Sequence, residues 1–479
     1  MTEPVSGRKP VLALFLRLLW AAALALPVFG VHAGAVLSTL YSFTGANDGS
    51  GPNALVQGSD GNFYGTTALG GNMNLNLGLG DGTVFKISPE GALTTLYAFS
   101  GADGANPAAG LVQGSDGNFY GTTYSGGTNA LAAGTVFKIS PNGALATLHS
   151  FSGDDDGGGP VAGLMQGSDG YFYGTTEGGG KYGDGTVFRI SANGVMDSFF
   201  SFVGVGDGAY VCAGLVQGSD GDFYGTTVFE GWSGGYGTVF RTSAGGGEET
   251  FYSFRGGNDG EYPHAGLALG SDGDFYGTTA GLPGGPGYGT VFKIRIGNIA
   301  LTTLHSFSGT NDGANPMAAL VRGNDGCFYG TTAGGGTYTN GTLFKIDTNG
   351  VLTSLYSFTG GNDGASPSAT LVRGNDGYFY GTTPGGGAAG FGTVFRLAAG
   401  LTVARAAPVF QPVGLTNGML GLTWSTEVGG TYQLQYNSDL SSSNWSNLGN
   451  AVTATGATLS ATDFVTNGPR RFYRVVLLQ

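Results

Sequence analysis

A five-residue word, Phe-Tyr-Gly-Thr-Thr, occurs seven times in this chain and limits what the chain can fold into. The copies recur at intervals of 51 to 56 residues and start at Phe63, Phe119, Phe172, Phe223, Phe275, Phe328 and Phe379. A Gly-Thr-Val/Leu-Phe word follows each copy, and a word of the Tyr-Ser-Phe type also recurs seven times. A repeat of this length, built from short strand-like words, is typical of one propeller blade.

Each repeat divides into four predicted strands, which in the second repeat cover 109–113, 118–123, 135–140 and 144–151. They are rich in Val, Phe, Tyr and Thr and are bounded by Gly, Asp, Asn and Pro, which is the pattern of strands and turns. No run has the length and period of a helix. We therefore expect an all-β fold, a seven-bladed β-propeller over residues 36–399.

The order of strands predicts how the ring closes. The first strand-like segment, 36–43, is of the outer type, whereas the last repeat ends on a third-type strand, 393–397. We expect the N-terminal strand to complete the last blade, because closure removes exposed strand edges. An open solenoid is the alternative.

The two ends of the chain differ from the repeats. Residues 1–33 combine a basic lead, a short apolar run and the small-residue site Val31-His32-Ala33, which predicts a signal peptide, an uncleaved anchor being the alternative. We expect an exported protein, extracellular, at the cell surface or in the periplasm, with no transmembrane segment in the mature chain. Residues 400–412 are a predicted linker, and the alternating strand 432–436 predicts a small fibronectin type III-like β-sandwich at 413–479.

Two longer words carry a family resemblance. Gly-Leu-Val-Gln-Gly-Ser-Asp-Gly-Asn-Phe-Tyr-Gly-Thr-Thr at Gly110 and Gly-Thr-Val-Phe-Lys-Ile-Ser at Gly134 resemble the GloVer (Gloeo/Verruco) tandem repeat of exported bacterial proteins. The resemblance covers roughly 36–397 and supports the fold and export, but it supplies no catalytic residues. Members often end in a surface anchor, and the sequence 471–479 contains no such motif that we recognise.

Composition excludes some classes of partner and chemistry. The net charge is −13, from 32 acidic and 19 basic residues, so we expect no nucleic-acid partner. The two cysteines, Cys212 and Cys327, occupy different places in the repeat, and we expect neither a disulfide nor a catalytic thiol.

Carboxylates recur in the turns of every repeat, where Asp stabilises a turn by bonding its own backbone. A ring of calcium sites is the alternative, since calcium prefers oxygen ligands. The one cluster, Asp154-Asp155-Asp156, is the best calcium candidate, and otherwise we expect no cofactor. A basic residue in each third strand, such as Lys86, is expected to pair with the hairpin acid of its own blade, such as Asp60; the alternative is a cationic ring.

Variable loops between the second and third strands carry the candidate site, because loops on a rigid scaffold are where binding occurs. The predicted ligand-binding residues are Tyr182, Phe229, Trp232, Tyr236, Tyr288 and Tyr338. Exposed aromatics stack on sugars or contact proteins; packing against the next blade is the alternative. Among acids, Glu177 and Glu230 are the one pair to consider for glycoside cleavage.

The sequence contains no Gly-X-Ser-X-Gly elbow, His-Glu-X-X-His motif or paired-cysteine zinc motif. We therefore expect a non-catalytic binding or surface-scaffold protein, with an extracellular glycan or protein as ligand. The alternatives are a secreted glycan-cleaving enzyme using the same face and a purely structural protein of the cell envelope.

Overall fold

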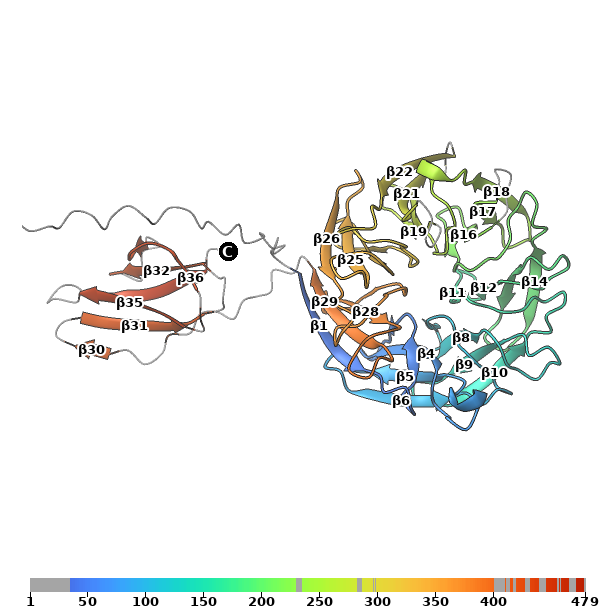
Figure 1. The fold of residues 1–479 in the computed structure, drawn as a ribbon, viewed down its shortest axis with the longest axis horizontal. Coiled ribbons are helices and arrows are strands. Elements are labelled where there is room, and N and C mark those ends of the chain that lie inside the picture. Colours follow the sequence, from blue (N-terminus) through green and yellow to red (C-terminus); the bar gives the residue numbers. More distant parts are fainter. Residues whose placement is uncertain are drawn as a thin grey trace, which may run out of the picture. The chain divides into compact units, whose positions relative to one another are not determined.

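A computed structural model describes residues 35–229, 235–281, 287–295, 297 and 299–399 of the repeat region. Beyond it, the structure describes 410, 414–416, 419–426, 431–438, 445–454, 456, 458–464 and 471–477. The described repeat residues form seven antiparallel sheets arranged in a ring (Figure 1). The fold is the predicted all-β propeller. The predicted signal peptide, 1–33, lies outside the described residues.

We number the blades one to seven by their Phe-Tyr-Gly-Thr-Thr words. The innermost strands are β3 (Val56–Gln57), β7 (Val112–Gln113), β11 (Met165–Gln166), β15 (Val216–Gln217), β19 (Ala268–Leu269), β23 (Val321–Arg322) and β27 (Val372–Arg373). The second strands are β4 (Phe63–Leu69), β8 (Phe119–Thr123), β12 (Phe172–Thr176), β16 (Phe223–Thr227), β20 (Phe275–Thr279), β24 (Phe328–Thr332) and β28 (Phe379–Thr383). The third strands are β5 (Thr83–Ile87), β9 (Thr135–Ile139), β13 (Thr186–Ile190), β17 (Thr238–Thr242), β21 (Thr290–Arg295), β25 (Thr342–Ile346) and β29 (Thr393–Ala399). The outer strands are β6 (Leu93–Ala98), β10 (Leu145–Ser150), β14 (Met196–Ser201), β18 (Glu248–Ser253), β22 (Ala300–Ser306), β26 (Leu352–Ser357) and β1 (Ala35–Ser42). Blade one has an additional short strand, β2 (Ser50–Pro52), and the 3₁₀ turns η1 (Asn76–Gly78) and η2 (Gly257–Asp259) complete the elements of the described ring.

The innermost strands are shorter than predicted, with two paired residues rather than five. The reason is the crowding of seven chains at the axis. A Cβ atom on Gly110 would lie 2.8 Å from the carbonyl oxygen of Ala54 in the neighbouring blade. The segment before the strand therefore packs against the next blade instead of pairing within its own.

The ring closes as the sequence predicts. β1 is the outer strand of blade seven, whose order is β1-β29-β28-β27. It pairs antiparallel with β29, with Leu37 opposite Leu397 (Figure 1). The first and last strands of the propeller thus share one sheet.

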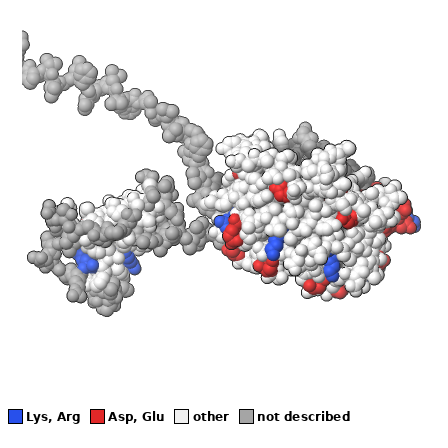
Figure 2. Space-filling model, turned by 90° about the horizontal axis from the view of Figure 1, so that it is seen from below, with Lys and Arg blue, Asp and Glu red and all other residues white. Residues whose placement is uncertain are grey.

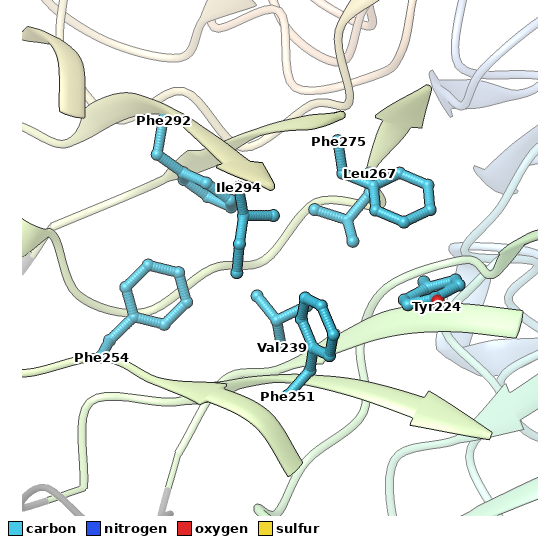
Figure 3. Packing of buried hydrophobic residues seen from close by; sticks show 8 residues of the cluster. All are labelled: Tyr224, Val239, Phe251, Phe254, Leu267, Phe275, Phe292 and Ile294. Atoms are coloured by element: carbon cyan, nitrogen blue, oxygen red, sulfur yellow. The ribbon is translucent and has the colours of Figure 1, made fainter. Parts of the chain in front are cut away.

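Neighbouring blades are joined by the aromatic and first threonine positions of the repeated word. The ring of Tyr64 stacks on that of Phe119 in the next blade, with centroids 4.0 Å apart. The Thr66 hydroxyl donates to the carbonyl oxygen of Ala109 across the same boundary, at 2.7 Å. Figure 3 shows the matching core between blades four and five, where Tyr224 faces Phe275. The repeated word is therefore an interblade contact.

The remaining positions of the word act inside the blade. A Cβ atom on Gly65 would lie 2.6 Å from the Phe85 ring of the third strand, so only glycine fits. The Thr67 hydroxyl is 2.8 Å from that of Thr83, and both are buried. This bond satisfies two polar groups in the core.

The hairpin acids pair with the third-strand cation in the lysine blades. Lys86 Nζ lies 2.8 Å from Asp60, and Tyr64 also donates to that carboxylate. Burial raises the pKa of Asp60, but hydrogen bonds from Lys86, Asn62 and Tyr64 outweigh it and hold the pKa well below its usual range. The same pair occurs at Lys138–Asp116, Lys293–Asp272 and Lys345–Asp325. On the face in Figure 2, most basic groups lie beside acidic ones.

The arginine blades depart from this prediction. Arg189 pairs with Asp197 of the outer strand at 2.9 Å, and its guanidinium lies over the Tyr171 ring. Arg241 binds Asp222 more closely than the hairpin acid Asp220, at 2.6 Å against 4.0 Å. Lys293 also binds the equivalent acid, Asp274, at 2.8 Å, but it keeps the hairpin acid Asp272 as well, at 2.7 Å.

The C-terminal region contains two further sheets. One joins β30 (Gly414–Thr416), β31 (Met419–Ser425) and β35 (Thr458–Phe464). The other joins β32 (Thr431–Asn437), β33 (Ser446–Asn447), β34 (Val452–Thr453) and β36 (Phe472–Leu477). Leu422 and Trp424 of one sheet share a buried cluster with Tyr432 and Leu434 of the other. The fibronectin type III-like assignment, the linker and the domain boundaries stay predictions.

Among the described residues, no helix is long and apolar enough to span a bilayer.

Candidate ligand-binding site

One face of the propeller carries the loops between the second and third strands together with the turns that lead from each blade to the next. We call it the variable-loop face. Backbone hydrogen bonds tie the two kinds of loop together, as where Ala209 N–H donates to the Phe229 carbonyl oxygen at 3.0 Å and Phe229 N–H donates back. Loop side chains are therefore held on a fixed frame.

Each turn between blades has a residue in the left-handed backbone region. In five turns this position holds a glycine, an asparagine or a serine: Gly51, Asn106, Gly159, Asn315 and Ser366. In two adjacent turns it holds Tyr210 and Tyr262, both with φ of 59°. This conformation costs free energy for a bulky side chain, and such strain clusters at functional sites.

The two tyrosines belong to a row of four aromatic rings. Tyr210 contacts Phe229 with centroids 5.4 Å apart, Phe229 contacts Tyr262 at 5.4 Å, and Tyr262 contacts Tyr236 at 6.1 Å. All three contacts are edge-to-face, which is a favourable geometry for aromatic pairs. Tyr210 remains 45% exposed and Phe229 41% exposed. The aromatic row, Tyr210, Phe229, Tyr262 and Tyr236, is thus ordered by its own contacts while part of it faces solvent.

The other predicted ligand-binding residues do not join this row. Tyr182 and Tyr338 are 51% and 52% exposed, and Lys181 lies over the Tyr182 ring at 5.1 Å. Tyr288, 45% exposed, lies against Gly309 of the next turn. Trp232, like the acid Glu230, lies outside the described residues.

Sequence reasoning selected Phe229 and Tyr236 and missed Tyr210 and Tyr262. A signal for them was present in the alignment of the repeats. Both stand immediately before the short run that leads into an innermost strand, where the other repeats have Gly, Asn or Ser. A bulky residue at a position that favours glycine is the deviation that marks this site.

Glu177 lies near Cys212, one of the residues that line the central cavity of the ring. Burial raises its pKa, and burial together with Glu177 raises the pKa of the Cys212 thiol to about 12. Cys212 and His264 line a central cavity of about 230 Å³ with the alanines and glycines that precede the innermost strands. Both cysteines are free, and at neutral pH the Cys212 thiol is protonated, so it is no nucleophile.

The three calcium candidates differ in their surroundings. Asp154 and Asp155 are exposed, whereas Asp156 accepts hydrogen bonds from Ser152 and lies 2.9 Å from His149. The described part of the chain has no group of three or more His, Cys, Asp or Glu side chains arranged to hold a metal ion. A calcium site at Asp154–Asp156 stays a prediction.

Comparison with known proteins gives a family. The model of the Gloeobacter/Verrucomicrobia repeat matches residues 27–233 and 213–432, most of the chain. The chain belongs to the Gloeobacter/Verrucomicrobia repeat family. This confirms the resemblance found in the sequence; the fibronectin-like part is not covered by that result.

Solved structures similar to this family member are propeller proteins of low identity. A gluconolactonase from Xanthomonas campestris is 12% identical (TM-score 0.39; 76% of this chain, 89% of that one). PorZ, a surface component of the type-IX secretion system of Porphyromonas gingivalis, is 12% identical (TM-score 0.47; 88% and 58%). A GH74 enzyme of Niastella koreensis is 12% identical (TM-score 0.47; 81% and 59%), so the chain spans under two thirds of the last two. No curated protein sequence matches the chain significantly.

Proposed function

We propose that this chain is an exported, non-catalytic binding protein that holds an extracellular glycan on the aromatic row, with a protein as the other candidate ligand. The observation that carries the proposal is the pair Tyr210 and Tyr262. Each adopts a costly left-handed backbone, yet neither is fully buried. Packing alone does not explain a strained aromatic residue that stays in contact with solvent.

The chemistry of the row supports a glycan. Aromatic faces pack on the apolar faces of sugars, and the tyrosine hydroxyls offer hydrogen bonds at the same surface. The ring contacts between Tyr210, Phe229 and Tyr262 fix the side chains before the ligand arrives. Such preorganisation reduces the entropy lost on binding.

A glycan-array assay followed by calorimetry on the best ligand tests the proposal. Phe229→Ala should weaken binding by about 10-fold or more, because a central aromatic anchor contributes about 2 kcal/mol. Tyr124→Ala is the matched control: Tyr124 is 44% exposed and stands on the same face in another blade. Equal losses in both variants, or no saturable binding by the chain, would refute the proposal.

Tyr210→Asn separates function from folding. Asparagine tolerates the left-handed region, so this variant should fold with equal or higher Tm while binding is lost. Retained binding in Tyr210→Asn would contradict the role of the row. Repeating the array with calcium and with a chelator, and on Trp232→Ala, tests the calcium and loop predictions.

A glycan-cleaving activity is the alternative to binding. It would appear as shortened oligosaccharides in chromatography of the bound ligand, lost in Glu177→Gln or Glu230→Gln. A chain that binds without cleaving supports the proposal, and a chain that binds nothing supports a structural role in the cell envelope.

A further inference from the structure

We propose a second binding site, for an anionic group, on the opposite face of the propeller, at Arg322 and Arg373. These residues end the innermost strands of blades six and seven. Blades one to four have glutamine in the same position, at Gln57, Gln113, Gln166 and Gln217, and blade five has Leu269. The site is independent of the aromatic row and of the function proposed for it.

The glutamines show what this position does. Gln113 Oε1 accepts a hydrogen bond from Ser59 N–H in the hairpin of the preceding blade at 2.9 Å. Its Nε2 donates to Gly117 O in its own hairpin and to Ser59 Oγ. The contacts from Gln166 to Ser115, from Gln217 to Ser168 and from Gln57 to Asn375 repeat this arrangement. Each glutamine thus caps the N–H group of the preceding hairpin.

Arginine cannot form that cap. A guanidinium has donors only, so it offers nothing to a backbone N–H group. The hairpins that precede Arg322 and Arg373 begin at Ser271 and Asn324, and within the described residues neither N–H group has an acceptor. Each arginine therefore stands at a hairpin whose backbone donor is unpartnered, and an anion accepts from both.

The two arginines are also without counter-charges. Arg322 is exposed and Arg373 half-buried, and no acid of the described chain lies within ion-pair distance of either. The hairpin acids Asp272 and Asp325 are engaged by Lys293 at 2.7 Å and by Lys345 at 2.6 Å. In a chain with 32 acidic and 19 basic residues, two such arginines in adjacent blades form a local positive site.

The chemistry selects carboxylate or phosphate. Both groups accept bidentate hydrogen bonds from a guanidinium and further bonds from backbone N–H groups. In the glutamine blades, Gln113 contacts Ser59, which stands two residues after Gln57. By the same repeat positions, Arg373 stands at the hairpin that contains Asn324, two residues after Arg322, and we expect both arginines to act on one ligand.

Calorimetric titration of the chain with trigalacturonate and, separately, with inorganic phosphate at low ionic strength tests this site. The two probes distinguish a carboxylate from a phosphate ligand, and neutral maltotriose is the uncharged control. Binding of either anion should weaken about 10-fold or more in the double variant Arg322→Gln/Arg373→Gln and also fall at high salt. Arg255→Gln, which removes one exposed cation from the variable-loop face, should leave the affinity unchanged.

The double variant carries its own folding control. Glutamine is the residue of blades one to four, so it should cap Ser271 and Asn324 and leave Tm unchanged or raised. Absence of binding by both anions, or equal binding by the chain and the double variant, would overturn the proposal. Loss of anion binding with retained binding at the aromatic row would support it and separate the two sites.

Discussion

At the scale of single residues, the aspartate in six of the seven turns between blades fixes the turn to the preceding outer strand. It accepts a hydrogen bond from a tyrosine or lies against a histidine ring nitrogen. The pairs are Tyr41–Asp48, Tyr97–Asp103, His149–Asp156, Tyr252–Asp259, His305–Asp312 and Tyr356–Asp363. These carboxylates therefore have the structural role that the turn interpretation gives them.

Asp207 is the exception among these turns. The residue in the tyrosine position is Phe200, and the residue that offers a hydroxyl in most other turns is Val203. The Val203 N–H group donates to the carboxylate at 2.9 Å, and Asp207 Oδ1 is buried without a partner. Burial raises the pKa of Asp207 and outweighs the backbone hydrogen bonds that stabilise the charged form.

Phe200→Tyr should therefore stabilise the protein. The new hydroxyl would reach Asp207 as Tyr356 reaches Asp363 at 2.9 Å. A hydrogen bond to a previously unpaired buried carboxylate contributes about 1 kcal/mol to the free energy of unfolding. Chemical denaturation of the variant, with the reverse change Tyr356→Phe as control, measures it. An unchanged or lower stability of Phe200→Tyr would show that Asp207 is satisfied by solvent.

At the scale of elements, an apolar register pair joins the end of the third strand to the outer strand in six of the seven blades. The register pairs are Ile87–Leu93, Ile139–Leu145, Ile190–Met196, Ile294–Leu301, Ile346–Leu352 and Leu397–Leu37. Blade four has Thr242 opposite Glu248 instead. Glu248 Oε1 is buried without a partner, and burial, with Asp207 and Glu249 nearby, raises the Glu248 pKa to about 7. The pairing of third and outer strands, which an apolar contact stabilises in six blades, is thus weakened in blade four.

Glu248→Leu should stabilise the protein, most at neutral and higher pH. The folded state binds the proton more tightly than the unfolded state, whose pKa is 4.5, so stability falls as the pH rises from about 4.5 to about 7. At pH 8 the expected gain in the free energy of unfolding is about 1–2 kcal/mol. This is less than the pKa shift gives at about 1.4 kcal/mol per pKa unit, because the side chain is partly solvated. Unfolding free energies from pH 4 to 8 measure it, with Glu90→Gln, an exposed acid in the corresponding turn of blade one, as control. A pH dependence that persists in Glu248→Leu would assign it to another group.

The strands were predictable because their information is local. The words that begin at Phe119 and Thr135 give β8 and β9 to within a residue of the predicted ranges. The innermost strand was predicted to be longer than it is. The sequence does not reveal that Gly110 lies against the neighbouring blade, and this contact decides whether Ala109 and Gly110 pair within their own sheet. The aromatic row was half predicted: Phe229 and Tyr236 stand out in a loop, whereas the importance of Tyr210 depends on a backbone angle that composition does not reveal.

At the scale of the whole molecule, the ring depends on one sheet built from both ends of the repeat region. β1 supplies Leu37, Leu40, Tyr41 and the following Phe43 to the clusters on either side of β29. These positions are filled in every other blade by a strand that follows directly in sequence. The order of strand types predicted this closure, because the last repeat lacks an outer strand and the repeat region begins with an additional one.

The closure predicts the effect of moving a strand. Deletion of residues 35–43 should lower the free energy of unfolding by several kcal/mol, since each large apolar side chain lost from a core costs about 2–5 kcal/mol. The exposed edge of β29 should also promote self-association. A permuted variant, in which residues 37–43 follow Leu397 through the turn 88–92, keeps the same strand, because Ile87 and Leu93 flank that turn as register partners just as Leu397 and Leu37 are partners.

Thermal unfolding and light scattering distinguish the outcomes. The permuted variant should unfold at nearly the temperature of the original chain and remain in the same oligomeric state, while the deletion variant unfolds earlier and associates. If the deletion variant is as stable as the original, the β1–β29 pairing does not close the ring in solution. If both variants fail, the outer strand must be supplied by the N-terminal segment in its own position, so closure depends on chain order as well as on side-chain packing.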